Sequence, residues 1–573
     1  MSILDEKIKS ETEAEPGGFS RRRFLSAGGV AAMAMAAGSV GIEPLVNKAG
    51  LAEAAQEVGP LLGAGRINTA HQHRIDQANR MADAGSPAHL NNGDEDDLTG
   101  FIGNYSKALP HNARGEVDPT AYGRLMTALS TGFQADFDNI VLGGNRKLTN
   151  PQAGLAFDME GNDPHQFVMP AAPAFSSAEA AGEMVELYWM ALLRDRSFLR
   201  YDSDSLAAAA VAELNNLSDF RGPKQGGQVT PQTLFRDRLP GTTVGPYMSQ
   251  FWYLKTPFGS EIINRRSRVL VAGSDHMTSF AEWLAVQNGN VPGSQRFENK
   301  RRYLSNGRDL GAWVHIDVLF QAYFEACLIM GTPVGDGGLG VPLNPGNPYT
   351  QSLTEDGFAT LGGPFLKTIL AEVSTRALKA VWFQKWFVHR RLRPEEYGGC
   401  IHVHKTGRRS YPIHPEVFRS EALDRISRKH GSYLLPMTFP EGSPTHPAYG
   451  AGHATVAGAC VTILKAMFDE SFVIPNPVVP NPSGANTQPY EGAPLTVLSE
   501  LHKVASNVAT GRNFAGVHWR TDAYWSLRLG EQVAACLLQD TLMMLNEDMS
   551  SGLSFTGFDG QPVTVSPASI TGL

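Results

Sequence analysis

Cysteine is scarce in this sequence. The 573 residues contain only four, which are Cys327, Cys400, Cys460 and Cys536. No two of them form a C-x-x-C pair, which argues against a zinc site or a thioredoxin-like redox motif. Three of the four lie in apolar stretches with helical periodicity, so we expect buried free thiols. Whether any disulfide bond forms stays an open question.

An excess of basic charge is also missing. The chain has 49 Lys and Arg against 57 Asp and Glu, a formal net charge of −8. This balance argues against nucleic acid as a partner, because a protein that binds phosphate backbones normally presents a basic surface. No run of 18 strongly apolar residues occurs, so the sequence predicts no membrane span. Alternating strand patterns are few.

The N-terminal residues resemble an export signal. Ser20-Arg-Arg-Arg-Phe-Leu25 precedes a weakly apolar stretch, and Ala52-Glu-Ala54 offers a cleavage site. This pattern is typical of bacterial twin-arginine signals, which export folded proteins. We expect a periplasmic or extracellular protein, and the alternative is an ordinary amphipathic N-terminal helix.

Helical periodicity dominates the rest of the chain. Apolar residues recur with a period of 3.6 over 366–384, 453–467, 501–508 and 519–547, and Arg393-Pro394 is expected to end the first of these helices. The expected fold is all-α, with helical bundles. The expected divisions are a signal and tether over 1–55, an N-terminal helical region over 56–230, a helical core over 231–548 and a tail over 549–573.

One helix begins in an unusual way. The stretch HPAYGAGHAT places Gly450, Ala451 and Gly452 directly before His453, which opens a long apolar helix. Glycine lets the backbone approach a ligand closely, and a helix N-terminus presents free N–H groups. Together they form a seat for an anion. The alternative is a tight turn with a capping glycine.

Two further segments supply cations and a second histidine. Lys385 and Arg393 lie near the end of one helix, and Arg512 is followed by His518 and Asp522. The two arginines offer planar forks suited to oxyanion oxygens. Asp522 lies one helical turn after His518, where it can orient the imidazole. The chemistry implied is that of a tetrahedral oxyanion, phosphate or vanadate.

The spacing Lys-x7-Arg-Pro, Gly-His, Arg-x5-His resembles the signature of PAP2-type acid phosphatases and vanadium-dependent haloperoxidases. The eight-residue step from Lys385 to Arg393, and His446 seven residues before His453, are similar to the bromoperoxidases of red algae and their bacterial relatives. Segments such as RRYLSNGRDLGAWVH and ATGRNFAGVHWRTDAYWSLRLGE extend the likeness over roughly 230–535.

The resemblance implies a vanadate cofactor and a role for each site residue. His518 is expected to bind vanadium. His453 is expected to be the acid–base residue, and Lys385 also acts on the peroxide. Asp522 orients His518, while His446 and Trp382 lie on the side of the halide and substrate. The residues expected around vanadate are Lys385, Arg393, Ala451, Gly452, His453, Arg512 and His518.

Two positions depart from the family pattern. The family commonly has serine where this chain has Ala451, so a hydroxyl contact to vanadate is missing. Algal bromoperoxidases tend to carry arginine three residues before the site lysine, and here that residue is Trp382, as in chloroperoxidases. The halide preference is therefore mixed by pattern, with bromide expected and chloride or iodide open.

The resemblance implies an enzyme that oxidises halide with hydrogen peroxide to hypohalous acid, which then halogenates small organic substrates. It also implies a homo-oligomer, and a structural calcium ion is not indicated. Two alternatives stay open. One is an exported acid phosphatase with His518 as nucleophile and His453 as the acid that protonates the leaving group. The other is a non-enzymatic anion-binding protein.

Overall fold

The computed structural model describes residues 63–573. The expected export signal over residues 1–55 lies outside these residues. The contacts divide the chain into two units, Met1–Gln77 and Ala78–Leu573. All the site residues belong to the second unit, and the predicted boundary at residue 230 stays a prediction.

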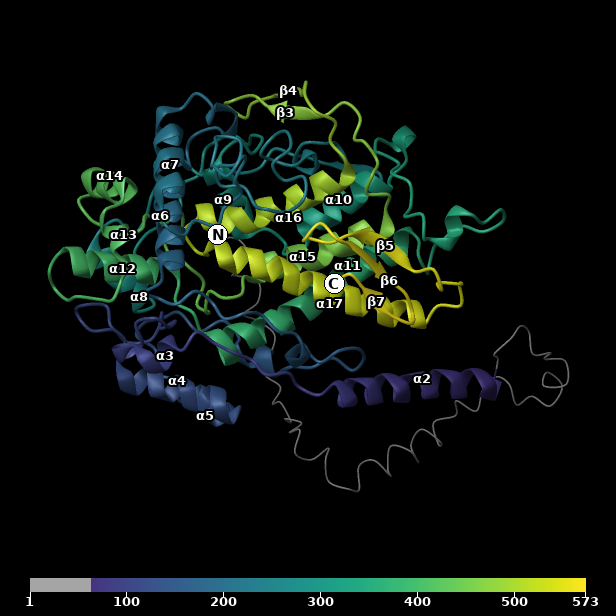
Figure 1. Cartoon of the computed structure of the whole chain (residues 1–573), viewed down its shortest axis with the longest axis horizontal. Coiled ribbons are helices and arrows are strands. Elements are labelled where there is room, and N and C mark those ends of the chain that lie inside the picture. Colours follow the sequence, from purple (N-terminus) through teal and green to yellow (C-terminus); the bar gives the residue numbers. More distant parts are fainter. Residues whose placement is uncertain (1–62) are drawn as a thin grey trace, which may run out of the picture. The chain divides into compact units, whose positions relative to one another are not determined.

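Helices are the main regular elements of the second unit (Figure 1). The mostly helical fold expected from the sequence is confirmed. The α-helices are α2 (Gly63–Ala84), α3 (Asp94–Asp97), α4 (Pro119–Thr131), α5 (Gln134–Asp138), α6 (Ala178–Leu193), α7 (Ser205–Asn216), α8 (Phe280–Gln287), α9 (Gly307–Ile316), α10 (Gln321–Gly331), α11 (Gly363–Phe383), α12 (Pro394–Lys405), α13 (Pro415–Phe418), α14 (Glu421–His430), α15 (Gly452–Met467), α16 (Val497–Phe514) and α17 (Arg520–Met543).

Helix α15 lies at the centre of the core and packs against α11, α16 and α17. Every residue of α15 is buried except His453. Helices α15 and α17 approach each other closely because each places a glycine in the contact between them. A Cβ atom on Gly458 would lie 2.0 Å from the Leu527 carbonyl oxygen, and one on Gly530 would lie 2.0 Å from that of Thr455. A second group of helices forms where α6 packs against α7, α13 and α14.

The sequence placed the end of one helix wrongly. Helix α11 continues into a π-helix, η9 (Gln384–His389), which ends there. Arg393-Pro394 does not end this helix but begins α12, with Pro394 at its first position. Proline suits that position because its fixed φ matches the helix and its missing N–H would be unpaired there anyway.

Three small antiparallel sheets complete the fold. The strands are β1 (Thr256–Phe258), β2 (Glu261–Ile263), β3 (Val478–Pro480), β4 (Thr487–Pro489), β5 (Leu553–Thr556), β6 (Pro562–Val565) and β7 (Ile570–Thr571). The sheets have the orders β1-β2, β3-β4 and β5-β6-β7. The last of these occupies the segment expected as a tail. Lys465 on α15 donates to the Thr556 carbonyl oxygen at 2.7 Å and so ties this sheet to the core.

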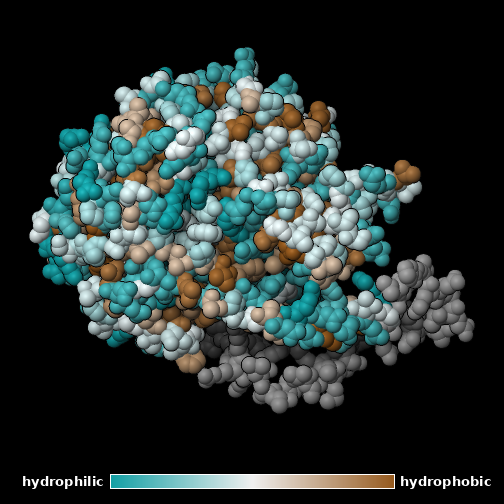
Figure 2. Space-filling model, viewed as in Figure 1, coloured by the Kyte–Doolittle hydropathy of each residue, from teal (hydrophilic) through white to brown (hydrophobic). Residues whose placement is uncertain are grey.

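Hydrophobic and hydrophilic residues are interspersed on the face drawn in Figure 2. Within residues 63–573 no single helix is long and apolar enough to cross a membrane. Helices α9 and α10 reach that threshold only as a pair, and a bend of 98° separates them.

Candidate active site

The segments singled out in the sequence meet at the N-terminal end of α15. Lys385 lies on η9, and Arg393 is the residue before α12. Arg512 lies in the last turn of α16, and His518 follows in the short connection to α17. The extended backbone at Trp519 ends that connection and starts α17, whose first turn carries Asp522.

Hydrogen bonds on both ring nitrogens orient His518. Its Nδ1 lies 2.8 Å from Oδ2 of Asp522, which also accepts the Trp519 backbone N–H at 3.0 Å. Its Nε2 lies 3.0 Å from a guanidinium nitrogen of Arg393, which can only donate. Nδ1 therefore carries the proton, and Nε2 presents a lone pair. This is the tautomer that a metal ligand or a nucleophile requires.

A second layer of charge supports Asp522. Arg391 donates to Oδ1 of Asp522 at 3.1 Å and to Glu183 at 2.8 Å. Burial raises the pKa of Asp522 to about 6, although the nearby Arg391 opposes the shift. The carboxylate is thus ionised at neutral pH and accepts the proton of His518.

Three buried cations surround His518. Lys385 and Arg393 are fully buried, and Arg512 is 4% exposed. The Nζ atom of Lys385 donates to the carbonyl oxygens of Pro447 at 2.8 Å and Ala448 at 3.1 Å. Burial lowers the pKa of Lys385 well below its ordinary value, and the charges of Arg393 and Arg512 lower it further. Burial, with the charge of Arg393, also lowers the pKa of Arg512, to about 10.

Trp382 and His446 form one side of the site. Nδ1 of His446 accepts from Arg393 at 2.9 Å, and the His446 ring lies 4.9 Å from that of Trp382. The Nζ atom of Lys385 lies 5.8 Å from the Trp382 ring centre. Burial lowers the pKa of His446 well below its ordinary value, and Lys385 and Arg393 lower it further, so this ring is neutral.

Ala451 and Gly452 form the entry to α15. Ala451 precedes the helix, and its N–H donates to Oγ of Ser526 at 2.7 Å. Gly452 is the first helical residue, so its N–H is one of the first four in the helix, which have no hydrogen-bond acceptor within the helix. A Cβ atom at Gly452 would lie 3.1 Å from the ring of Trp382, so glycine keeps this backbone accessible.

Asp317 belongs to the site although no motif in the sequence pointed to it. This residue follows α9, and its Oδ1 lies 3.1 Å from Nε2 of His453. Burial raises the pKa of Asp317, but the contact with His453 and the charge of Arg512 outweigh burial and leave the pKa below its ordinary value. No spacing in the sequence reveals the pair, because the two residues are 136 positions apart.

These residues fit a multiply charged oxyanion. Lys385, Arg393 and Arg512 present positive charge, and the helix N-terminus adds backbone N–H groups. Among the residues that the structure describes, the buried Nε atom of Arg512 has no hydrogen-bond partner. An oxyanion oxygen would provide an acceptor for it. Direct contacts connect most of the predicted site residues, namely Trp382, Lys385, Arg393, His446, Gly452, His518 and Asp522. His453 is connected to them through Asp317, which interacts with Arg512, and Ala451 is the chain neighbour of Gly452.

Comparison with known proteins points to the same chemistry. The family model described as the VCPO second helical-bundle domain matches residues 421–547. The chain is 35% identical over 553 residues to a vanadium-dependent bromoperoxidase of Corallina pilulifera, covering 81% of this chain and 91% of that protein. It is 30% identical over 524 residues to a vanadium-dependent bromoperoxidase of Ascophyllum nodosum, covering 87% and 92%.

The fold agrees with a solved structure over most of its length. The homohexameric structure of the second vanadate-dependent bromoperoxidase from Ascophyllum nodosum superposes with a TM-score of 0.83 and 31% identity, covering 90% of this chain and 95% of that one. The family resemblance stated from the sequence is confirmed by this agreement. The chain belongs to the family of vanadium-dependent bromoperoxidases.

Proposed function

We propose that this protein binds vanadate and uses hydrogen peroxide to oxidise bromide to hypobromous acid, which then halogenates small organic molecules. One observation carries the proposal. His518 presents the Nε2 lone pair, because Asp522 holds its Nδ1 proton, in the middle of three buried cations. The names of the relatives support the choice of vanadium, peroxidase chemistry and bromide.

The residues around His518 would hold vanadate. Nε2 of His518 would bind the metal, and Lys385, Arg393, Arg512 and the Gly452 N–H would bind its oxygens. Bound vanadate supplies Lewis acidity, which makes hydrogen peroxide more reactive toward a halide. The burial of the three cations excludes water and strengthens their electrostatic effect.

His453 and Asp317 are suited to move protons. Asp317 accepts the Nε2 proton of His453, so in the neutral ring Nδ1 is the nitrogen that takes up and releases a proton. His453 is also the one residue of α15 that is not buried, so protons can be exchanged with solvent through it. His446 and Trp382 lie beside Lys385, where we place the halide.

The same cations would also bind phosphate, so an acid phosphatase is the alternative. Two assays on one preparation separate the two functions. We expect bromination of a phenolic dye that requires both peroxide and added vanadate, with little hydrolysis of a phosphate monoester. Monoester hydrolysis without vanadate-dependent bromination would overturn the proposal. Running the assay with bromide, chloride and iodide also determines the halide preference.

We further propose that the protein is exported and forms a homo-oligomer. The twin-arginine pattern before residue 25 supports export. The homohexameric relative supports self-association. Cell fractionation of the wild type and of a variant with Arg21 and Arg22 replaced by lysine tests export. Analytical ultracentrifugation determines the number of subunits.

A further inference from the structure

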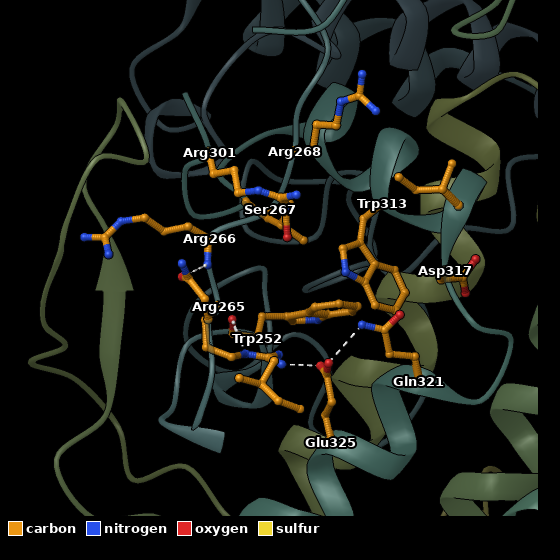
Figure 3. Close-up of a pocket in the computed structure, with 14 residues that line it drawn as sticks. Trp252, Arg265, Arg266, Ser267, Arg268, Arg301, Trp313, Asp317, Gln321 and Glu325 are labelled. Carbon is orange, nitrogen blue, oxygen red and sulfur yellow. Dashed lines mark hydrogen bonds and ion pairs between the residues drawn. The ribbon is translucent and has the colours of Figure 1, made fainter. Parts of the chain in front are cut away.

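A cavity of about 290 Å³ is lined in part by Asp317, and its other lining residues do not belong to the vanadate site (Figure 3). Its walls come from the segment 263–268, from Trp252 and Trp313, from Arg301 and from the first turns of α10. The volume is near the lower end of the range for pockets that bind small molecules.

Two tryptophans form an aromatic wall of the cavity. The rings of Trp252 and Trp313 lie 4.6 Å apart at 84°, an edge-to-face arrangement. Trp252 is buried, and its Nε1 donates to Asn507 at 3.0 Å, which fixes its ring. Trp313 is half-buried, and Figure 3 shows it between Trp252 and Asp317. A rigid wall of this kind suits a planar aromatic ligand.

The cavity carries a net positive charge. Four arginines line it, against the carboxylates of Asp317 and Glu325. Arg265 is occupied by an ion pair with Glu325 and by bonds to backbone oxygens, and the Asp317 carboxylate is occupied by His453. Both carboxylates are therefore engaged, which leaves the charge of other arginines to act on a ligand.

Arg301 is the arginine best placed to do so. Arg266 lies over the ring of Tyr303 and Arg268 over that of Phe297, and in Figure 3 both side chains extend away from the centre of the cavity. Arg301 instead extends toward Ser267. Among residues 63–573 no hydrogen-bond or ion-pair partner is found for it. The Arg301 side chain is exposed and lines the same cavity as the two tryptophans, so it is free to pair with the acidic group of a ligand whose ring contacts the aromatic wall.

Asp317 connects this cavity to the vanadate site. Its carboxylate lines the cavity and also accepts the proton of His453. A ligand bound against Trp313 would therefore lie next to the pair that handles protons during bromide oxidation. Hypobromous acid formed at the vanadate site would therefore be released close to that ligand.

We propose that this cavity binds an aromatic acid as the organic substrate, with the ring against Trp313 and the acidic group on Arg301. The halogenation of that substrate rests on the proposed function, whereas its binding does not. A small inorganic anion would use the charge of Arg301 but would not need the aromatic wall.

Binding to vanadate-free protein tests the proposal independently of catalysis. The probes are 4-hydroxybenzoate and its neutral counterpart 4-hydroxybenzyl alcohol, measured by calorimetry. We expect the acid to bind at least about tenfold more tightly than the alcohol. Arg301→Gln should remove that preference, and Arg301→Lys should restore part of it. Trp313→Leu should weaken the binding of both probes. Equal binding of acid and alcohol to the wild type would overturn the proposal.

A matched control separates a local effect from a change in net charge. Arg428 on α14 is exposed and far in sequence from the cavity, and Arg428→Gln should leave both affinities unchanged. If Arg428→Gln and Arg301→Gln weaken the binding of 4-hydroxybenzoate equally, the cavity is not the binding site. If the acid binds as proposed but the wild type with vanadate does not oxidise bromide, the cavity assignment is supported and the proposed function fails.

Discussion

Nε2 of His453 lies 3.1 Å from Oδ1 of Asp317, and this contact determines which nitrogen of the ring can exchange protons. The Asp317 side chain is almost fully buried, whereas that of His453 is 21% exposed. The carboxylate is thus a fixed acceptor on one side of the ring, and it also stabilises the imidazolium that forms when His453 takes up a proton.

Removing that support should slow turnover without releasing the cofactor. We expect Asp317→Ala to lower the bromination rate by about 10–100-fold, the range typical of residues that orient another group. Asp317→Asn keeps a hydrogen-bond acceptor but loses the charge, so its bromination rate should fall by a smaller factor. Vanadium content, measured after dialysis, should equal that of the wild type. A variant that loses vanadium would show that Asp317 supports binding instead of proton transfer.

Substitution of the two histidines of the site should have different effects on vanadium retention. His518→Ala removes the only proposed bond from protein to metal, so vanadate should wash out on dialysis. His453→Ala leaves that bond and the three cations, so vanadium should stay while the rate falls by about 10²–10⁴-fold. Elemental analysis and a bromination assay on both dialysed variants decide this. The assignment is wrong if His453→Ala loses vanadium and His518→Ala retains it.

Restoring the hydroxyl that the family usually carries should tighten vanadate binding. Ala451 is buried directly before α15, beside Gly452. In Ala451→Ser, a hydrogen bond to a vanadate oxygen would contribute about 1.5–3 kcal/mol if the hydroxyl reaches it. Titration of metal-free protein with vanadate measures the change, with Ala208→Ser, on the exposed face of α7, as control. Unchanged affinity would mean that position 451 does not face the cofactor.

Tetrahedral anions should stabilise the metal-free protein. Burial of Lys385, Arg393 and Arg512 near one another costs free energy, which a bound anion offsets. Vanadate and phosphate should both raise Tm, by an amount equivalent to about 2.7 kcal/mol at a hundred times Kd, and phosphate should inhibit bromination by competition. Sodium chloride at equal ionic strength is the control. Full bromination by stripped enzyme in phosphate buffer would contradict the vanadium assignment.

Acid should destabilise the protein in part through His389. This ring is 4% exposed, and burial with the neighbouring charges of Arg390 lowers its pKa to about 3. The unfolded chain takes up the proton near pH 6.5. Between these values the unfolded state binds more protons, so the free energy of unfolding falls as pH falls, by up to about 1.4 kcal/mol per unit.

Urea unfolding of the wild type and His389→Gln at pH 7 and pH 5 measures this contribution. The variant should lose less stability than the wild type between the two pH values. An equal loss would show that His389 does not contribute. Replacing His71 by Gln, on the exposed part of α2, provides a control for unfolded-state effects of the substitution.

The residue pattern predicted the main helices and, together with the family resemblance, the residues that meet around His518. The period of apolar residues predicted α15 and α17 to within four residues at each end, because both helices are long, but for α16 it covered only 501–508 of Val497–Phe514. The cations and histidines were visible because each lies within a short, spaced motif. The roles of the individual site residues stay predictions.

Other features depend on contacts that spacing does not record. Asp317 became a site residue only through the packing of α9 against α16, which brings it to His453. The final sheet was also missed. Leu553 and Phe555 are buried while Ser554 is exposed, and β6 alternates in the same way, but each strand spans only four residues. So short an alternation is weak evidence for a strand.

The π-helix at Gln384–His389 departs from regular α-helical geometry at the site. A π turn holds one residue more than an α turn, and such turns are often found at functional sites. Here it lies between α11 and Arg393, and it carries the site lysine, Lys385. The wider turn sets the direction in which the Lys385 side chain leaves the helix, so the geometry of the anion site depends on this local departure from α-helical hydrogen bonding.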